Sequence, residues 1–168
     1  MKEIIHNEDS ISMVDINKVV KRAKILFLDS KDRFLLATVN NDIHIVGGHV
    51  ENNETDEEAI KREVREETGV SIDISLKKPV VCIKYFCKDF PKLNTNTLFI
   101  ANYYLVNMDI VPDLDNTALE EGEKAGNFNL FYINKNDAID YIKKSLKNCT
   151  NKNVALDTID VIKECLHE

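Results

Sequence analysis

The chain has 168 residues, 43% hydrophobic and 30% charged, which is typical of one globular domain with a sizeable core, here residues 1–168. Its formal net charge of -7 and its lack of basic clusters exclude a long nucleic acid as the expected partner, because polyanions are bound by grouped Lys and Arg side chains. Without a long apolar run or a signal-peptide pattern, we expect no membrane partner and a cytoplasmic location.

A meander of three strands is predicted early in the chain. It follows from short apolar runs separated by polar turn residues, at residues 21–28, 34–39 and 43–46. The third strand is expected to end at Gly47. Residues 1–17 mix charged and apolar positions without a clear period, so the sequence leaves their structure open.

A helix is predicted to start at Thr55 and to stop at Gly69. Thr55 and Glu58 have the spacing of a capping box, in which each side chain satisfies a backbone N–H of the other residue. Gly69 suits the left-handed conformation that often ends a helix. Three residues form an apolar stripe for packing: Ala59, Ile60 and Val64.

The second half of the chain predicts three further strands, at residues 79–86, 97–106 and 128–133. The polar segment 113–127 is expected to be a loop before the last of them. Two helices are expected afterwards, one capped by Asn136 and one over residues 154–166. The four cysteines lack C-x-x-C spacing, so we expect buried free thiols at Cys82, Cys87, Cys149 and Cys165.

Three glutamates share one face of the predicted helix, because residues three and four positions apart point in similar directions. These are Glu63, Glu66 and Glu67, called the box carboxylates below. Like charges at this spacing repel one another unless a cation binds between them. Oxygen ligands without nearby His or Cys suit Mg²⁺ or Mn²⁺. Arg62 can pair with Glu58 or Glu66 and hold a carboxylate in a fixed direction.

The segment that carries these glutamates, residues 48–70, reads G-H-V-E-N-N-E-T-D-E-E-A-I-K-R-E-V-R-E-E-T-G-V. Its spacing is Gly, five residues, Glu, seven residues, then Arg-Glu-Val-x-Glu-Glu-x-Gly-Val. This resembles the Nudix box of the Nudix hydrolases at every defined position. The resemblance implies an α+β fold, an α/β/α sandwich with a mixed β-sheet between helices. The core would span about residues 19–146, with a helical extension over 153–167.

The resemblance also implies an activity: hydrolysis, with Mg²⁺ or Mn²⁺, of a pyrophosphate bond in a nucleoside diphosphate linked to another moiety. Glu63 and Glu67 would then be the chief metal ligands, and Glu66 a ligand or the base. A backbone carbonyl of Gly47 or Gly48 would join the metal shell. Arg62 would support catalysis by orienting a carboxylate.

Family members often draw a further carboxylate from a loop before the last strand. Glu120, Glu121 and Glu123 lie in such a loop, and we favour Glu121 or Glu123 without choosing between them. Three residues are weaker candidates for substrate binding, each with a plain structural alternative. Arg22 could grip phosphate with two hydrogen bonds, His49 could reach phosphate, and Tyr85 could stack on a base or lie in the core.

Two other functions are weighed against hydrolysis. A non-catalytic nucleotide sensor with this fold would commonly have lost box carboxylates, and none is lost here. An isomerase of isoprenoid diphosphates would need a Cys upstream of the box, whereas all four cysteines follow it. A homodimer is also possible, since many relatives are dimers and residues 154–166 offer an apolar stripe. Which nucleotide derivative is the substrate is not encoded in a legible motif.

Overall fold

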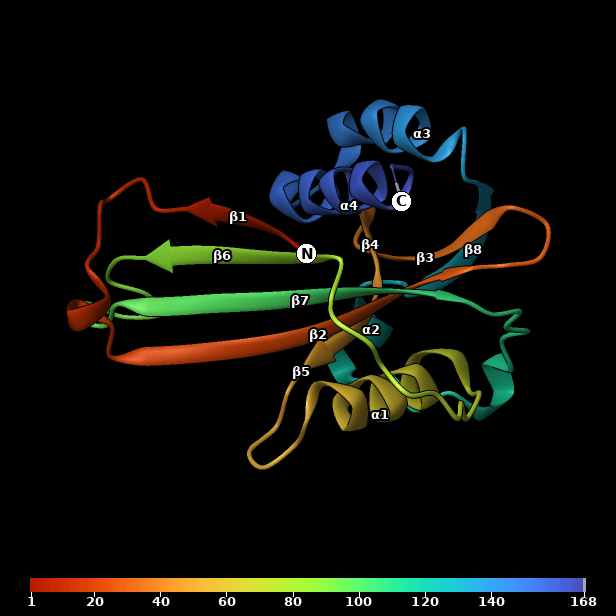
Figure 1. Cartoon of the computed structure of the whole chain (residues 1–168), viewed down its shortest axis with the longest axis horizontal. Helices are drawn as coiled ribbons and strands as arrows, with labels where there is room; N and C mark the ends of the chain where they lie inside the picture. The colour runs from red at the N-terminus through yellow and green to blue at the C-terminus, as the bar shows by residue number, and fades with distance from the viewer. Residues whose placement is uncertain (168) are drawn as a thin grey trace.

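The computed structural model describes residues 1–167, and its centre is a mixed sheet of eight strands with helices on both faces (Figure 1). The strand order is β1-β6-β7-β2-β3-β4, with β5 also paired to β2 and β8 to β3. This confirms the predicted α+β fold. The strands are β1 (Lys2–His6), β2 (Lys18–Leu28), β3 (Arg33–Val39), β4 (Asp42–His44), β5 (Val46–His49), β6 (Val81–Cys87), β7 (Thr97–Asn107) and β8 (Asn129–Asn134).

Strand β2 organises the sheet. It runs parallel to β7 along its whole length, antiparallel to β5 over its middle, residues 22–25, and antiparallel to β3 at its C-terminal end. Successive side chains of a strand point to opposite faces, so Ala23, Ile25 and Phe27 pack toward α1 (Asp56–Thr68). Leu26 packs toward α3 (Ala138–Ser145) and α4 (Lys152–Cys165) on the other face. Each face of the sheet therefore has its own core.

Helix α1 begins and ends as predicted. The Thr55 side chain accepts a hydrogen bond from the Glu58 backbone, Glu58 returns the bond, and Gly69 caps the helix with φ 73°. The predicted apolar stripe is buried against the sheet. Asp56, in the first turn, accepts hydrogen bonds from Asn102 at 2.8 Å and Tyr104 at 2.7 Å, both on β7. The helix is thus fixed to the sheet by its core face and by its first turn.

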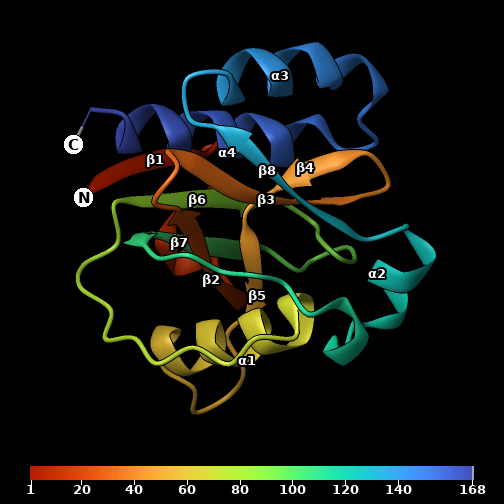
Figure 2. The same ribbon diagram turned by 90° about the vertical axis from the view of Figure 1, so that its right-hand side faces the viewer.

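The predicted meander is wrong in its third strand. Residues 42–44 form β4, which pairs with β3, and the chain then crosses to form β5, which pairs with β2. Gly47 and Gly48 lie inside β5 instead of ending a strand. Gly47 has φ 118°, a conformation that favours glycine. The glycine pair is therefore held by the sheet, directly above α1 (Figure 2).

Two other local predictions need correction. The expected loop over residues 113–127 contains a short helix, α2 (Glu121–Ala125), with a capping box between Glu120 and Glu123. The N-cap of α3 is Asp137, not Asn136, and it makes no side-chain capping bond. Among the cysteines Cys82 is buried and the other three are partly exposed, because each of those three lies at or just beyond the end of a helix or strand.

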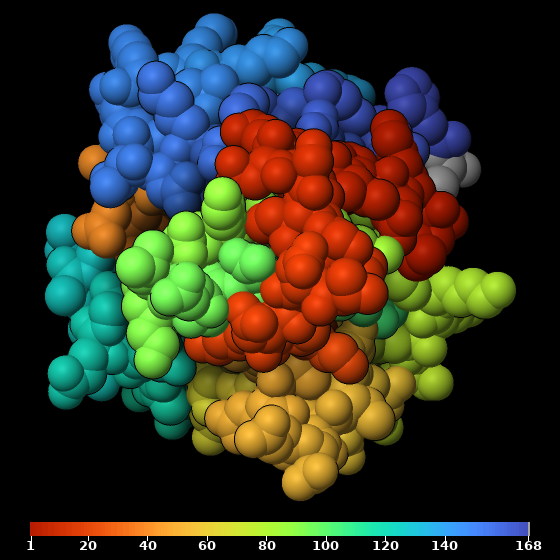
Figure 3. Space-filling model, turned by 90° about the vertical axis from the view of Figure 1, so that its left-hand side faces the viewer, coloured from red at the N-terminus to blue at the C-terminus, as the bar shows by residue number. Residues whose placement is uncertain are grey.

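The two ends of the described chain pack onto the sheet. Strand β1, which the sequence left open, pairs in parallel with β6, and the N-terminal segment lies against the β6–β7 end of the molecule (Figure 3). The apolar residues of α4, which the sequence offered as a possible dimer surface, pack inside the chain: Ala155, Ile159 and Ile162. That stripe therefore gives no support for a dimer. No helix within residues 1–167 has the length and apolarity needed to cross a membrane.

Candidate active site

The box carboxylates lie where α1 faces β5. Glu67 is only 2% exposed, and it accepts a hydrogen bond from the Gly47 backbone N–H at 3.2 Å. The Glu63 carboxylate lies directly against Gly48, where an added Cβ would collide with it. Glu66 is more exposed than Glu63: 32% of the Glu66 side chain is exposed, against 12% of the Glu63 side chain. The glycine pair thus lets two acidic side chains, those of Glu63 and Glu67, approach the backbone of β5 closely.

Arg62 ties this cluster together. Its guanidinium donates two hydrogen bonds to Glu54, at 2.9 and 3.1 Å. It also bonds Glu63 at 2.9 Å, Glu66 at 3.1 Å and the His49 carbonyl at 2.8 Å. The predicted pair with Glu66 is therefore present, whereas Glu58 is used in the helix cap. Arg62 fixes the directions of Glu63 and Glu66, and its acidic neighbours raise its own pKa.

The charged form of Glu67 has a high electrostatic cost in this site. Burial, reinforced by the charges of Glu123 and Glu63, raises the pKa of Glu67 to about 8, although Lys24 acts in the opposite direction. Burial also raises the pKa of Glu63, against the effect of Arg62. A cation bound here would relieve both costs.

Lys24 on β2 is a cation whose charge acts on this buried carboxylate. It is 9% exposed, and its ammonium group donates hydrogen bonds to the carbonyl oxygens of Ile45 at 2.9 Å and Gly47 at 2.8 Å. Burial lowers its pKa, while the charge of Glu67 partly restores it. The two bonds bridge the crossing between β4 and β5, so Lys24 shapes the backbone on which Glu67 rests.

The donor set suits a hard divalent cation, because it consists of carboxylate oxygens with no His or Cys. The raised pKa of Glu67 shows that protein groups do not fully offset the cost of its charged form. Within residues 1–167, no group of three or more His, Cys, Asp or Glu side chains is arranged so that it could hold a metal ion. Arg62 holds Glu63 and Glu66 in this conformation. The carboxylate oxygens therefore fit a hard metal ion by their chemistry.

Of the three glutamates before β8, Glu123 is the one that interacts electrostatically with the box carboxylates Glu66 and Glu67. Its charge acts on Glu67, and burial raises its own pKa together with the charges of Glu120 and Glu66. Glu121 is exposed. The capping bond from the Glu120 backbone to the Glu123 carboxylate, at 2.7 Å, orients Glu123. Residues 113–118 hold this segment onto the last turn of α1 through backbone bonds to Glu66 and Thr68.

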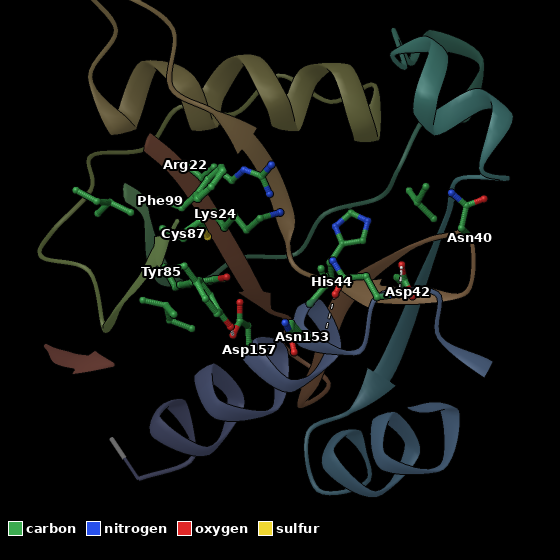
Figure 4. Close-up of a pocket in the computed structure, with 17 residues that line it drawn as sticks. Arg22, Lys24, Asn40, Asp42, His44, Tyr85, Cys87, Phe99, Asn153 and Asp157 are labelled. Atoms are coloured by element: carbon green, nitrogen blue, oxygen red, sulfur yellow. Dashed lines mark hydrogen bonds between the residues drawn. The ribbon is translucent and has the colours of Figure 1, made fainter. Parts of the chain in front are cut away.

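A cavity of about 410 Å³ adjoins the cluster on the α4 face of the sheet (Figure 4). Its aromatic wall includes Tyr85, Phe99 and Tyr103, and its polar groups include Asp157 from α4. Arg22 and Lys24 enter it from β2, with Lys24 between Arg22 and His44 (Figure 4). Because Lys24 also contacts Gly47, it stands at the boundary between the cavity and the box carboxylates.

The predicted substrate-binding residues occupy different places around the cavity. Arg22 lines it, and the buried Nε of Arg22 has no hydrogen-bond partner within residues 1–167. His49 is exposed outside the cavity lining and approaches Arg22, with 3.5 Å between Nη2 and Nε2. Tyr85 lines the cavity, but one face of its ring is stacked on His6 at 4.3 Å between centroids. Its hydroxyl donates to Asp157 at 2.5 Å.

Sequence reasoning missed Lys24, His44 and Asp157. Lys24 did offer a signal, since it is a lone charge within an apolar strand and two positions after Arg22. Burial and the charge of Lys24 lower the pKa of His44 to about 3, so this ring is neutral. Burial raises the pKa of Asp157 to about 6. His44 and Asp157 line the cavity only because the tertiary fold brings them there.

Comparisons with known proteins agree on one family. A family model described as the NUDIX domain matches residues 19–127, more than half of the chain. A NUDIX hydrolase from Nitrosomonas europaea has a similar structure, with a TM-score of 0.56, 21% identity, and coverage of 89% of this chain and 88% of that one. The MutT protein from Methanosarcina mazei Go1 aligns with a TM-score of 0.53, 16% identity, and coverage of 90% and 97%. The E. coli ORF135 protein gives a TM-score of 0.56, 14% identity and 94% coverage of both chains. No curated protein sequence matches the chain.

Proposed function

Since this chain belongs to the Nudix family, we propose that it hydrolyses a pyrophosphate bond in a small nucleotide derivative, a nucleoside diphosphate linked to another moiety. The observation that carries the proposal is the placement of Glu67 against Gly47 and of Glu63 against Gly48, beside a cavity of about 410 Å³. That volume lies within the range of small-ligand sites. Phosphates would lie near α1 and the nucleoside in the cavity.

The proposed orientation of the substrate follows from the charges. Arg22 lines the cavity with a buried, unpartnered Nε, and a guanidinium can bind phosphate oxygens with two parallel hydrogen bonds. Beyond it, Tyr85, Phe99 and Tyr103 provide apolar surface for a base. The unbonded oxygen of Asp157 could accept a hydrogen bond from an N–H edge of that base. His49, at the outer side of Arg22, would face the second moiety.

The box carboxylates would hold Mg²⁺ or Mn²⁺, with Glu63 and Glu67 as the main ligands. When bound, the metal would supply charge to the pyrophosphate oxygens and favour ionisation of the attacking water. Glu66 or Glu123 would accept the proton of that water. Burial raises the pKa of Glu123, which makes it a stronger base than an ordinary glutamate. Arg62 would keep Glu63 and Glu66 in position.

The test is a substrate panel. Purified protein is incubated with Mg²⁺ or Mn²⁺ and with NDP-sugars, ADP-ribose, dinucleoside polyphosphates and (d)NTPs, and released nucleoside monophosphate and phosphate are measured. At least one compound should be cleaved, and Glu67→Gln should abolish the cleavage. Glu8→Gln, which removes an exposed charge, is the control and should be active. Wild-type activity in Glu67→Gln would refute the metal assignment, and tight nucleotide binding without turnover would favour a sensor.

A further inference from the structure

Lys24 occupies a position that resembles a cation site. Its ammonium group is surrounded by two carbonyl oxygens, those of Ile45 and Gly47, and it is under the electrostatic influence of Glu67 and Glu63. Oxygen atoms of carbonyls and carboxylates are also the ligands that hard metal ions prefer. The Gly47 carbonyl is one of the two that the Nudix resemblance offers to the metal. Here it accepts a hydrogen bond from Lys24 instead.

A surface role does not explain this arrangement. A lysine side chain that is 9% exposed loses most of its hydration, which is costly unless its charge is matched by nearby acceptors. The Ile45 and Gly47 carbonyls satisfy two of its three N–H groups. The charge itself is offset chiefly by Glu67, which is only 2% exposed. The two buried charges therefore depend on each other.

We propose that the Lys24 ammonium is a built-in cation of the active site that takes the place of one metal contact. It binds the Gly47 carbonyl oxygen, withholds that oxygen from a metal ion, and offsets part of the charge of the box carboxylates. The metal requirement of the site is correspondingly reduced. The inference rests on the proposed function, because it concerns how the same carboxylates bind metal.

The experiment measures Mn²⁺ binding to the full chain without nucleotide, by the EPR signal of free Mn²⁺ and by calorimetry. Lys24→Gln removes the charge but keeps two N–H donors for the carbonyls, and Lys24→Met removes both. Lys21→Gln is the matched control, since Lys21 is an exposed lysine on the same strand. Removing a positive charge a few ångströms from a metal site should tighten Mn²⁺ binding roughly tenfold or more in Lys24→Gln. Lys24→Met should bind at least as tightly, and Lys21→Gln should resemble the wild type.

The direction of the change separates this proposal from a structural role. A lysine that only supported the backbone would, when replaced, loosen Gly47 and Glu67 and weaken Mn²⁺ binding. Unchanged or weaker binding by folded Lys24→Gln would therefore overturn the proposal. If the wild type binds Mn²⁺ and Lys24→Gln binds it no more tightly, only the role of Lys24 fails. If neither binds Mn²⁺ at millimolar concentration, the metal assignment of the proposed function fails with it.

Discussion

Arg62 is the residue whose replacement should reveal most about how the site is held together. Arg62→Ala removes the shared partner of three carboxylates, those of Glu54, Glu63 and Glu66. The carboxylates remain close together and repel one another, and the segment before α1 loses its main polar contact with the helix. We therefore expect both stability and activity to fall.

The expected loss of stability lies between the values for exposed and buried ion pairs. The Arg62 side chain is 26% exposed, and the three carboxylates are 12 to 32% exposed. Exposed pairs contribute at most about 1 kcal/mol, whereas removing one partner of a buried pair costs about 3–5 kcal/mol. We expect a loss of about 2–4 kcal/mol in the free energy of unfolding, or roughly 5–10 °C in Tm for a chain of this size. Arg62→Lys keeps the charge but not the fork of donors, so its loss should be smaller.

The assay is urea unfolding and thermal melting in EDTA, repeated with Mg²⁺. The matched control is Lys61→Ala, which removes a neighbouring cation that pairs with Glu57 on the solvent side of the same helix, and it should lose much less. Mg²⁺ should reduce the defect of Arg62→Ala, because a bound cation offsets the unpaired carboxylates and stabilises the folded state by mass action. A stability of Arg62→Ala equal to that of Lys61→Ala in EDTA would refute the reasoning.

Three further predictions concern acid stability, the proton acceptor and the glycine pair. Because the folded protein lowers the pKa of His44 to about 3 from 6.5, its stabilising contribution is full above pH 6.5 and declines as the pH falls. Between pH 7 and about pH 4.5, the wild type should lose roughly 2–3 kcal/mol more than His44→Gln in urea unfolding, and parallel pH profiles would contradict this. Glu123→Gln should lower kcat at least about tenfold in the assay that detects the substrate, with Glu121→Gln near wild type, and the reverse order would identify Glu121 as the acceptor. Gly48→Ala, whose Cβ would meet the adjacent box carboxylate, should lose activity while its Tm changes little. Gly122→Ala, where nothing lies within 4 Å of an added Cβ, is its control, and equal activity of the two variants would show that the close contact at Gly48 is unimportant.

The parts of the site that sequence reasoning could predict are those fixed by local interactions. Helix α1 is specified by signals within fifteen residues of one another: a capping box at Thr55, an apolar stripe and a left-handed Gly69. The shared face of the box carboxylates follows from helix geometry alone. Each of these features depends on neighbours along the chain, so the sequence contains all the information needed to expect them.

The rest of the site depends on contacts between distant segments. The crossing from β4 to β5 is supported by the bonds from Lys24 to Ile45 and Gly47, more than twenty residues further along the chain. The apolar residues on both sides of the crossing led to the prediction of a single strand over residues 43–46. The hydrophobic pattern of a strand does not show which neighbouring strand it pairs with. The bond between Tyr85 and Asp157 joins residues 72 positions apart. Asp157 belongs to no sequence motif, yet it supplies a polar group to the wall of the cavity. The carboxylate side of the candidate site is thus specified locally, whereas its cavity side is specified by tertiary packing. The motif therefore identifies the family, while the choice of the proposed substrate would depend on cavity residues such as Asp157.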